Sequence, residues 1–253
     1  MLDSIHIAAL GMESQQTLVD TISNNIANVN TQSYKSAQVQ FNDLVSQSDG
    51  LSGEKNVQRG AGVQVASVVQ NTAAGDLKLT DNELDLAISG KGYFELMDEN
   101  GDLYYTRNSS FQINSDGILE SVDGMSLSAL IQVPSDYVDL SVKQNGEVYA
   151  NVPDREDPVQ LGQLELAHFV NPNGLENTGN GIYTATSDSG EAQYFSTDNN
   201  PSQIFQGYVE SSNVDMVTEL TSLVLAQKAY GLNSRILQAS DEILGLINDL
   251  RRG

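Results

Sequence analysis

The sequence contains no cysteine and no tryptophan, and it has only two histidines. The missing cysteines exclude disulfides, thiolate metal sites and cysteine nucleophiles. His6 and His168 lie far apart, and no His-Glu-x-x-His pattern supports a zinc site. The Gly-x-Ser-x-Gly turn of many serine hydrolases is also missing. The residues therefore favour a structural or binding protein over an enzyme. They predict no catalytic, cofactor-binding or metal-binding residue.

Positive charge is scarce, because 12 Lys and Arg residues face 34 Asp and Glu residues, for a net charge of -22. A nucleic-acid interface needs clustered cations, so this class of partner is excluded, and docking on anionic lipid is disfavoured. No run reaches the roughly 18 apolar residues of a membrane span. Residues 1–6 lack the basic and apolar blocks of a secretory signal. Any export is therefore expected to follow another route.

Proline is absent from both ends of the chain, and both ends repeat apolar residues in steps of seven. The repeated positions are Ile5, Met12, Val19 and Ile26 at one end, and Met216, Leu223, Tyr230, Leu237 and Leu244 at the other. This spacing predicts amphipathic helices over residues 2–29 and 214–250. Neither narrow stripe can be buried alone, so we expect the two helices to pair as a coiled coil. The alternative is two ordinary amphipathic helices on a globular core.

The middle of the chain has the pattern of β-structure. Asn-Gly and Asp-Gly turns between short apolar runs predict hairpins over residues 93–106, 111–119 and 142–149, and residues 161–170 resemble a further strand. Residues 43–62 are polar with little periodicity, which predicts a linker or an extended arm. We therefore expect an α+β protein with long terminal helices and a central all-β domain of the sandwich or barrel type.

The expected organisation has three parts. A terminal helical domain combines residues 1–40 with 207–253, an extended arm covers residues 41–75, and the central β domain covers residues 76–206.

Two segments at opposite ends carry a specific resemblance. Residues 24–35 read NNIANVNTQSYK, and residues 207–214 read GYVESSNV. Both are similar to signatures of the bacterial flagellar basal-body rod and hook family, as are LDLAISGKGYF at 84–94, YTR at 105–107 and FVNPNGL at 169–175. The resemblance covers essentially the whole chain and is closest to the distal rod group. Ser33 stands where the family usually has glycine, and the arm is shorter than is usual for that group.

The resemblance implies a structural subunit that polymerises into a hollow helical tube. Such a tube transmits torque from motor to hook and forms part of the export channel. The implied partners are further copies of the chain, other rod subunits, the hook protein, the surrounding ring proteins and the flagellar export apparatus. The implied location is the basal body across the cell envelope, reached without a cleaved signal. The alternatives are a proximal rod or hook-type axial subunit and, from another class, a β-domain enzyme or carbohydrate-binding module.

The same resemblance and the helix stripes predict the residues of subunit assembly. The mid-helix asparagines are expected to set register across subunits, with local capping as the alternative reading near the helix end. The predicted assembly residues are Asn24, Asn25, Ile26, Ala27, Asn28, Thr31, Tyr34, Lys35, Gly207, Tyr208, Glu210, Ser212, Asn213, Val214, Leu223, Gln227, Tyr230, Asn233, Leu237 and Leu244.

Overall fold

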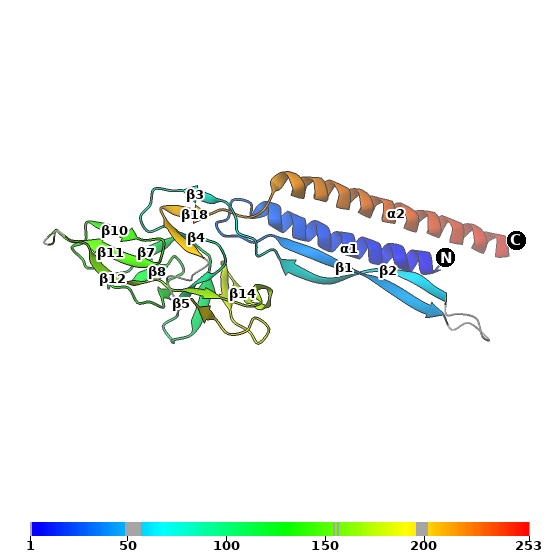
Figure 1. Ribbon diagram of the computed structural model, residues 1–253. Helices are drawn as coiled ribbons and strands as arrows, with labels where there is room; N and C mark the ends of the chain where they lie inside the picture. The colour runs from blue at the N-terminus through cyan, green and yellow to red at the C-terminus, as the bar shows by residue number, and fades with distance from the viewer. Residues whose placement is uncertain (1, 49–56, 154, 156, 196–201, 253) are drawn as a thin grey trace. The chain divides into compact units, whose positions relative to one another are not determined.

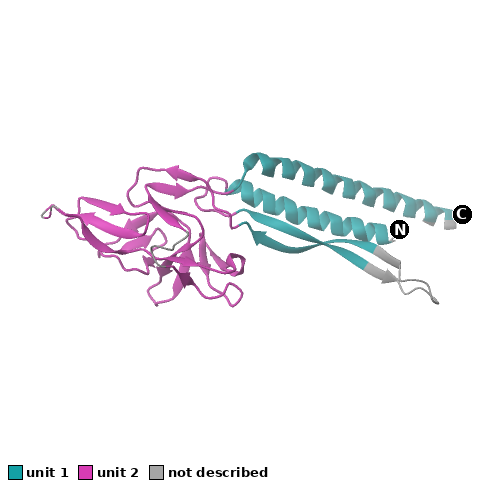
Figure 2. Ribbon diagram, in the orientation of Figure 1, with its two compact units in different colours: residues 1–28, 36–71, 214–253 teal, residues 29–35, 72–213 magenta. Residues whose placement is uncertain are grey.

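The computed structural model describes residues 2–48, 57–153, 155, 157–195 and 202–252. The chain forms two compact units, shown in Figure 2. Unit 1 comprises residues 1–28, 36–71 and 214–253, and unit 2 comprises residues 29–35 and 72–213. Most of the predicted arm at 41–75 therefore lies in the same unit as the terminal helices.

Unit 1 consists of two helices and a long hairpin (Figure 1). Helix α1 spans Leu2–Ala27 and helix α2 spans Met216–Arg252. The two helices lie side by side and run in opposite directions. Close approaches link Asn25 to Glu219 and Gly11 to Asn233, as antiparallel neighbours require. No helix in the described part of the chain is long and apolar enough to cross a membrane.

The helix boundaries lie close to those expected from the sequence. Helix α2 begins where Asp215 accepts hydrogen bonds from the backbone amides of Val217, at 2.9 Å, and Thr218, at 3.4 Å. An acidic residue at this position both satisfies free amides and matches the positive end of the helix dipole. The long helices and the β-rich middle confirm the α+β class.

The segment predicted to be a linker or an extended arm is β-strand at residues 43–48 and 57–62, and its residues 49–56 lie outside the described residues. Strand β1 spans Ala37–Ser48 and pairs antiparallel with strand β2, Val57–Gln70. The register shifts between Gln40 and Phe41, and again between Leu44 and Val45. Each bulge moves the following side chains to the other face, so the alternation that identifies a strand in sequence is interrupted. The two skipped residues, Ala66 and Ala61, lie in β2, so the interruption affects that strand.

Unit 2 contains two larger sheets and two short strand pairs. The three-stranded sheet has the order β10 (Asp139–Val142), β11 (Glu147–Asn151), β12 (Val159–Gln163). The nine-stranded sheet has the order β14 (Glu176–Gly179), β15 (Ile182–Thr184), β6 (Leu103–Thr106), β5 (Tyr93–Met97), β9 (Ser126–Leu127), β8 (Leu119–Ser121), β7 (Phe111–Ile113). Off this path, β13 (Leu166–His168) pairs with β5 and β16 (Gln193–Tyr194).

The remaining strands bring distant parts of the chain together. Strand β17 (Gln203–Gln206) pairs with β4 (Leu86–Ser89), and β18 (Tyr208–Glu210) pairs with β3 (Leu77–Leu79). A single-turn helix covers Pro172–Gly174. Through these pairs the segment before α2 returns to the start of the β-rich unit.

One apolar core cluster spans both sheets of unit 2, and a second, formed by Tyr93, Tyr105, Ala167 and Tyr183, lies on the large sheet. The fully buried members of the first cluster include Phe94 and Leu96 of the large sheet and Leu140 and Val148 of the small one. The three predicted hairpins are confirmed as β5–β6, β7–β8 and β10–β11. The single strand expected over residues 161–170 is wrong, because β12 and β13 divide this segment between the two sheets.

Candidate assembly surface and a buried ion cluster

Helix α2 exposes many large apolar side chains. Leu225 is 62% exposed and Leu246 is 64% exposed, whereas Ala226 is buried. The exposed set on this helix comprises Met216, Val217, Leu220, Val224, Leu225, Tyr230, Leu232, Ile236, Ile243, Leu246, Ile247 and Leu250. Apolar surface of this extent along one element is typical of an interaction site. The described part of unit 1 therefore does not bury the apolar surface of its own longest helix.

The predicted assembly residues of α2 lie partly within this surface. Tyr230 and Gln227 are exposed, while Leu223, Leu237 and Leu244 are half-buried. Asn233 differs from these residues, because its side chain lies against α1. A Cβ added at Gly11 would be 2.7 Å from its amide nitrogen.

The predicted asparagines at the end of α1 and just after it form hydrogen bonds inside the subunit. Asn25 is 1% exposed, and its amide group donates to the Ala37 carbonyl at 2.9 Å and to Glu219 at 3.1 Å. Its carbonyl oxygen accepts from the Ala37 amide at 2.9 Å. Asn28 donates to the backbone and side-chain oxygens of Asn24, at 2.9 and 3.0 Å. The latter pattern is the local helix-end arrangement considered as the alternative above.

Other predicted residues lie near the end of α1 or in the segment that precedes α2. Ala27 and Thr31 are exposed, and Ile26, Tyr34, Tyr208, Ser212 and Val214 are half-buried. Gly207 has a φ of +77°, a conformation that favours glycine. Asn213 donates its side-chain amide to the Ala73 carbonyl at 2.9 Å, and its backbone amide donates to the Tyr34 carbonyl at 3.3 Å.

Lys35 and Glu210, one from each signature, meet inside unit 2. The Lys35 Nζ lies 2.5 Å from Oε1 of Glu210, and Nε of Arg107 lies 2.9 Å from Oε2. The backbone amide of Gly75 also donates to Oε1, at 2.8 Å. The Glu210 side chain is 0% exposed. The two predicted assembly residues are therefore partners of each other within one chain.

The remaining hydrogen-bonding capacity of the cations is directed at backbone carbonyls. Lys35 donates to Ala73 at 2.9 Å, and Arg107 donates to Gly92, Gly90 and Ile88 at 3.0, 3.1 and 3.3 Å. Among the described residues, no buried side-chain nitrogen or oxygen lacks a hydrogen-bond partner. Complete pairing of this kind is what allows charges to persist away from water.

The protonation of Glu210 follows from this environment. Burial alone raises the pKa of its carboxyl group. The charges of Arg107 and Lys35, with the hydrogen bonds from Lys35 and Gly75, outweigh burial and hold the pKa of Glu210 below its ordinary value. Glu210 is therefore an ionised acceptor at neutral pH. Burial also lowers the pKa of Lys35, against the raising effect of Glu210.

Arg107 is the member of this cluster that was not among the predicted site residues. It lies 103 positions from Glu210, and Lys35 lies 175 positions from Glu210. The YTR at residues 105–107, which is similar to a family motif, was the feature of the sequence that could have pointed to Arg107. Sequence spacing alone could not show that three charged residues so far apart share one buried centre.

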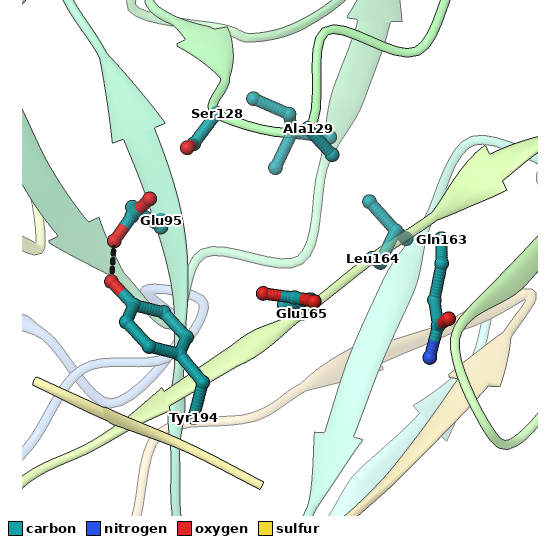
Figure 3. A pocket seen from close by; sticks show the side chains of 8 residues that line it. Glu95, Ser128, Ala129, Gln163, Leu164, Glu165 and Tyr194 are labelled. Carbon is teal, nitrogen blue, oxygen red and sulfur yellow. Dashed lines mark hydrogen bonds between the residues drawn. The ribbon is translucent and has the colours of Figure 1, made fainter. Parts of the chain in front are cut away.

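A separate polar pocket of about 430 Å³ lies in unit 2 (Figure 3). Glu95, Glu165, Gln163 and Ser128 contribute its polar groups, and Tyr194 donates a short hydrogen bond to Glu95. Burial and the neighbouring Glu95 raise the pKa of the Tyr194 hydroxyl, so it remains a donor. None of the predicted assembly residues lines this pocket. Within the described ranges, no group of three or more side chains suited to metal binding occurs.

One unit thus carries a long helix with exposed apolar side chains, and the other is β-rich with its own buried core. Family models of flagellar axial proteins match three parts of the chain. They are the flagella basal body rod protein at residues 5–35, the flagellar hook protein FlgE/F/G D1 domain at 87–150, and the flagellar basal body rod FlgEFG protein C-terminal region at 206–250.

Full-length relatives define the family more narrowly. The chain is 38% identical to the flagellar basal-body rod protein FlgG of Agrobacterium fabrum, over 97% of this chain and 98% of the relative. It is 37% identical to that of Caulobacter vibrioides, over 99% and 100%. It is 33% identical to that of Borreliella burgdorferi, over the whole of both chains. The chain belongs to the FlgG-type flagellar basal-body rod protein family and is a structural subunit of the distal-rod type.

Proposed function

We propose that the chain polymerises with copies of itself into the hollow helical tube of the distal rod. The observation that carries this proposal is the row of exposed apolar residues on α2, which the described residues of one subunit leave unburied. Neighbouring subunits would bury this row, with α1 and α2 pairing as a coiled coil in the tube wall. The β-rich unit would form the outer part of the wall.

In this role the chain carries out no chemical reaction. It transmits torque from the motor to the hook, and its inner surface forms part of the export channel. Its partners would be other rod subunits, the hook protein, the surrounding rings and the export apparatus, and its location would be the basal body across the cell envelope. Family membership and the two terminal helices support this proposal. The second candidate is a proximal rod or hook-type axial position, and the short arm between the terminal helices and the β-rich middle is the sequence feature that favours it.

Two single substitutions, each made in a separate variant, test the assembly surface. Leu225→Asp and Leu232→Asp each place a charge at an exposed apolar position of α2, 62% and 59% exposed. Because both side chains are largely exposed, the free subunit should fold normally. Burial of the new carboxylates between subunits would be costly, so rod assembly and motility should be lost. Gln238→Asp, at an exposed polar position of the same helix, is the matched control. Motility equal to that of the control would contradict the proposed surface.

A further inference from the structure

The chain crosses between the two units four times, at residues 28/29, 35/36, 71/72 and 213/214. Every mechanical connection along the backbone between the helices and the β-rich unit must pass through these crossings. The segments of unit 2 that begin or end at them are therefore the places where load enters that unit. The strength of their attachment to the rest of unit 2 determines whether the load passes into that unit or only unfolds the segment itself.

All three of these segments in unit 2 are bonded to one side chain, that of Glu210. Glu210 lies three positions before the last crossing, and its carboxylate binds Lys35, which is the final residue before the second crossing. The same carboxylate accepts the amide of Gly75, close after the third crossing. One buried group thus joins the segments 29–35, 72–76 and 207–213.

Further hydrogen bonds within unit 2 reinforce the same junction. The Ser33 amide donates to the Glu210 carbonyl at 2.8 Å, and the Ser33 hydroxyl donates to the Arg107 carbonyl at 2.6 Å. The Ala73 carbonyl accepts from both Lys35 and Asn213, each at 2.9 Å. The three segments are therefore bonded to one another as well as to Glu210.

Arg107 connects this junction to the sheet framework. It follows strand β6 directly, and its guanidinium group donates to Glu210 and to carbonyls in the segment between β4 and β5. Because the group is planar and its donors point in fixed directions, it holds several acceptors at a defined geometry. Glu210 is thereby linked to the large sheet through Arg107, which is buried, with 4% of its surface exposed.

We propose that the Lys35–Glu210–Arg107 cluster is the mechanical anchor of the subunit, fixing the connecting segments to the β-rich unit so that load on the terminal helices passes into it. This role rests on the proposed function in the rod, because only a loaded assembly requires it. The cluster itself acts inside one subunit, so its two signature residues serve the connection within the chain rather than a contact between copies.

Hydrogen exchange of the full-length free chain tests the anchoring directly. In Glu210→Gln, the backbone amides of Ser33, Gly75 and Asn213 should exchange at least about tenfold faster. The reason is that their segments lose a charged acceptor, and the two buried cations lose their counter-charge. The amides of Val133 and Leu164, bonded to Gly117 and Gly146 elsewhere in unit 2, should accelerate less, because local openings at these sites leave the junction intact. Glu147→Gln, which breaks the exposed Lys143–Glu147 pair, is the matched control and should change none of these amides.

Two results would overturn the anchor. Unchanged exchange at the three junction amides would show that Glu210 does not fix the segments. Equal acceleration throughout unit 2 would show a contribution to general stability alone. If Glu210→Gln does not fold, Lys35→Met applies the same test, because it retains the Arg107–Glu210 pair and removes the bonds from Lys35 to Glu210 and Ala73.

A pulling measurement addresses the load itself. The chain has no native cysteine, so Asp20→Cys and Ser187→Cys, both at exposed positions, provide the sole attachment points, one in each unit. Glu210→Gln should lower the force at which the segments separate from unit 2, relative to Glu147→Gln. Equal forces would reject the anchor. Neither measurement requires polymerisation, so failure of the anchor and failure of the proposed rod assembly are distinguishable.

Discussion

At the scale of the residue, Glu210 couples the stability of the β-rich unit to pH. Its pKa in the folded chain lies below the ordinary value of 4.5, so the unfolded chain binds the proton more readily. The stabilisation is therefore complete above pH 4.5 and is lost as the pH falls through the folded-state pKa. At neutral pH, Glu210→Gln should reduce the free energy of unfolding by about 3 to 5 kcal/mol, because it leaves two buried cations without their counter-charge.

Denaturant unfolding from pH 7 down to pH 3 measures this effect. The difference in unfolding free energy between wild type and Glu210→Gln should shrink as the pH falls. Glu147→Gln removes a carboxylate that is only partly buried and pairs with one lysine, and it serves as the control at each pH. A wild-type advantage that stays constant down to the lowest pH would contradict ionisation of Glu210 as its source.

Gly75 provides a second test at this scale. A Cβ at this position would lie 2.0 Å from the Ser211 carbonyl oxygen, which is part of the backbone and cannot rotate away. Gly75→Ala should destabilise unit 2 by about 1 to 3 kcal/mol, as overpacking usually does. Gly60→Ala is the control, since nothing lies within 4 Å of its added Cβ. Thermal unfolding compares the two, and equal midpoints would show that the backbone near Ser211 adjusts freely.

The predicted site residues show what sequence can and cannot reveal at this scale. The signatures directed attention to Lys35 and Glu210 as assembly residues, but resemblance does not distinguish a contact within a subunit from one between subunits. The decisive fact is that strand β18 returns beside β3 and brings the two charges together, which is a consequence of long-range pairing. Ser33 replaces the usual glycine yet adopts a φ of +55°, and its hydroxyl donates to Arg107.

At the scale of the element, the helices were predictable and their packing faces were not. The steps of seven located both helices to within a few residues. In α1, however, Ile5, Met12, Val19 and Ile26 are only half-buried. Its most buried positions are Ala8, Gly11, Ser14, Ile22 and Asn25. Small side chains allow neighbouring elements to approach closely, and this buries their positions more fully than those of larger residues. A hydrophobic pattern cannot identify such a face.

A matched pair of glycine substitutions tests this close approach. Gly245 in α2 has open space around an added Cβ, so Gly245→Ala should stabilise the helix by about 1 kcal/mol through propensity alone. Gly11→Ala has the same propensity gain in α1, but its Cβ would meet the Asn233 amide at 2.7 Å. We expect a smaller gain or a loss. Helix unfolding followed by circular dichroism measures both, and equal gains would show that Asn233 moves aside without cost.

At the scale of the whole molecule, the distribution of burial indicates an assembled state. The described part of unit 2 buries two clusters of apolar side chains, which is typical of a domain that folds around its own side chains. Helix α2, in contrast, exposes Leu225, Leu246 and Leu250. The sequence shows the stripe of this helix, but it cannot show which part of the stripe remains for other subunits, because that depends on what α1 and the hairpin already cover.

The position along the axial structure is the last property to test, and it separates the distal rod from the hook-type alternative. Rod subunits remain in the basal body when the hook is removed, whereas hook subunits leave with it. We therefore expect mass spectrometry to find this chain in hook–basal bodies and to find it undiminished, relative to other rod subunits, after the hooks are stripped. Recovery in the hook fraction would instead assign it to the hook, in keeping with the short arm. Absence from both fractions would contradict the proposed assembly itself, whatever the fate of the Glu210 anchor, because the anchor is measured on the free chain.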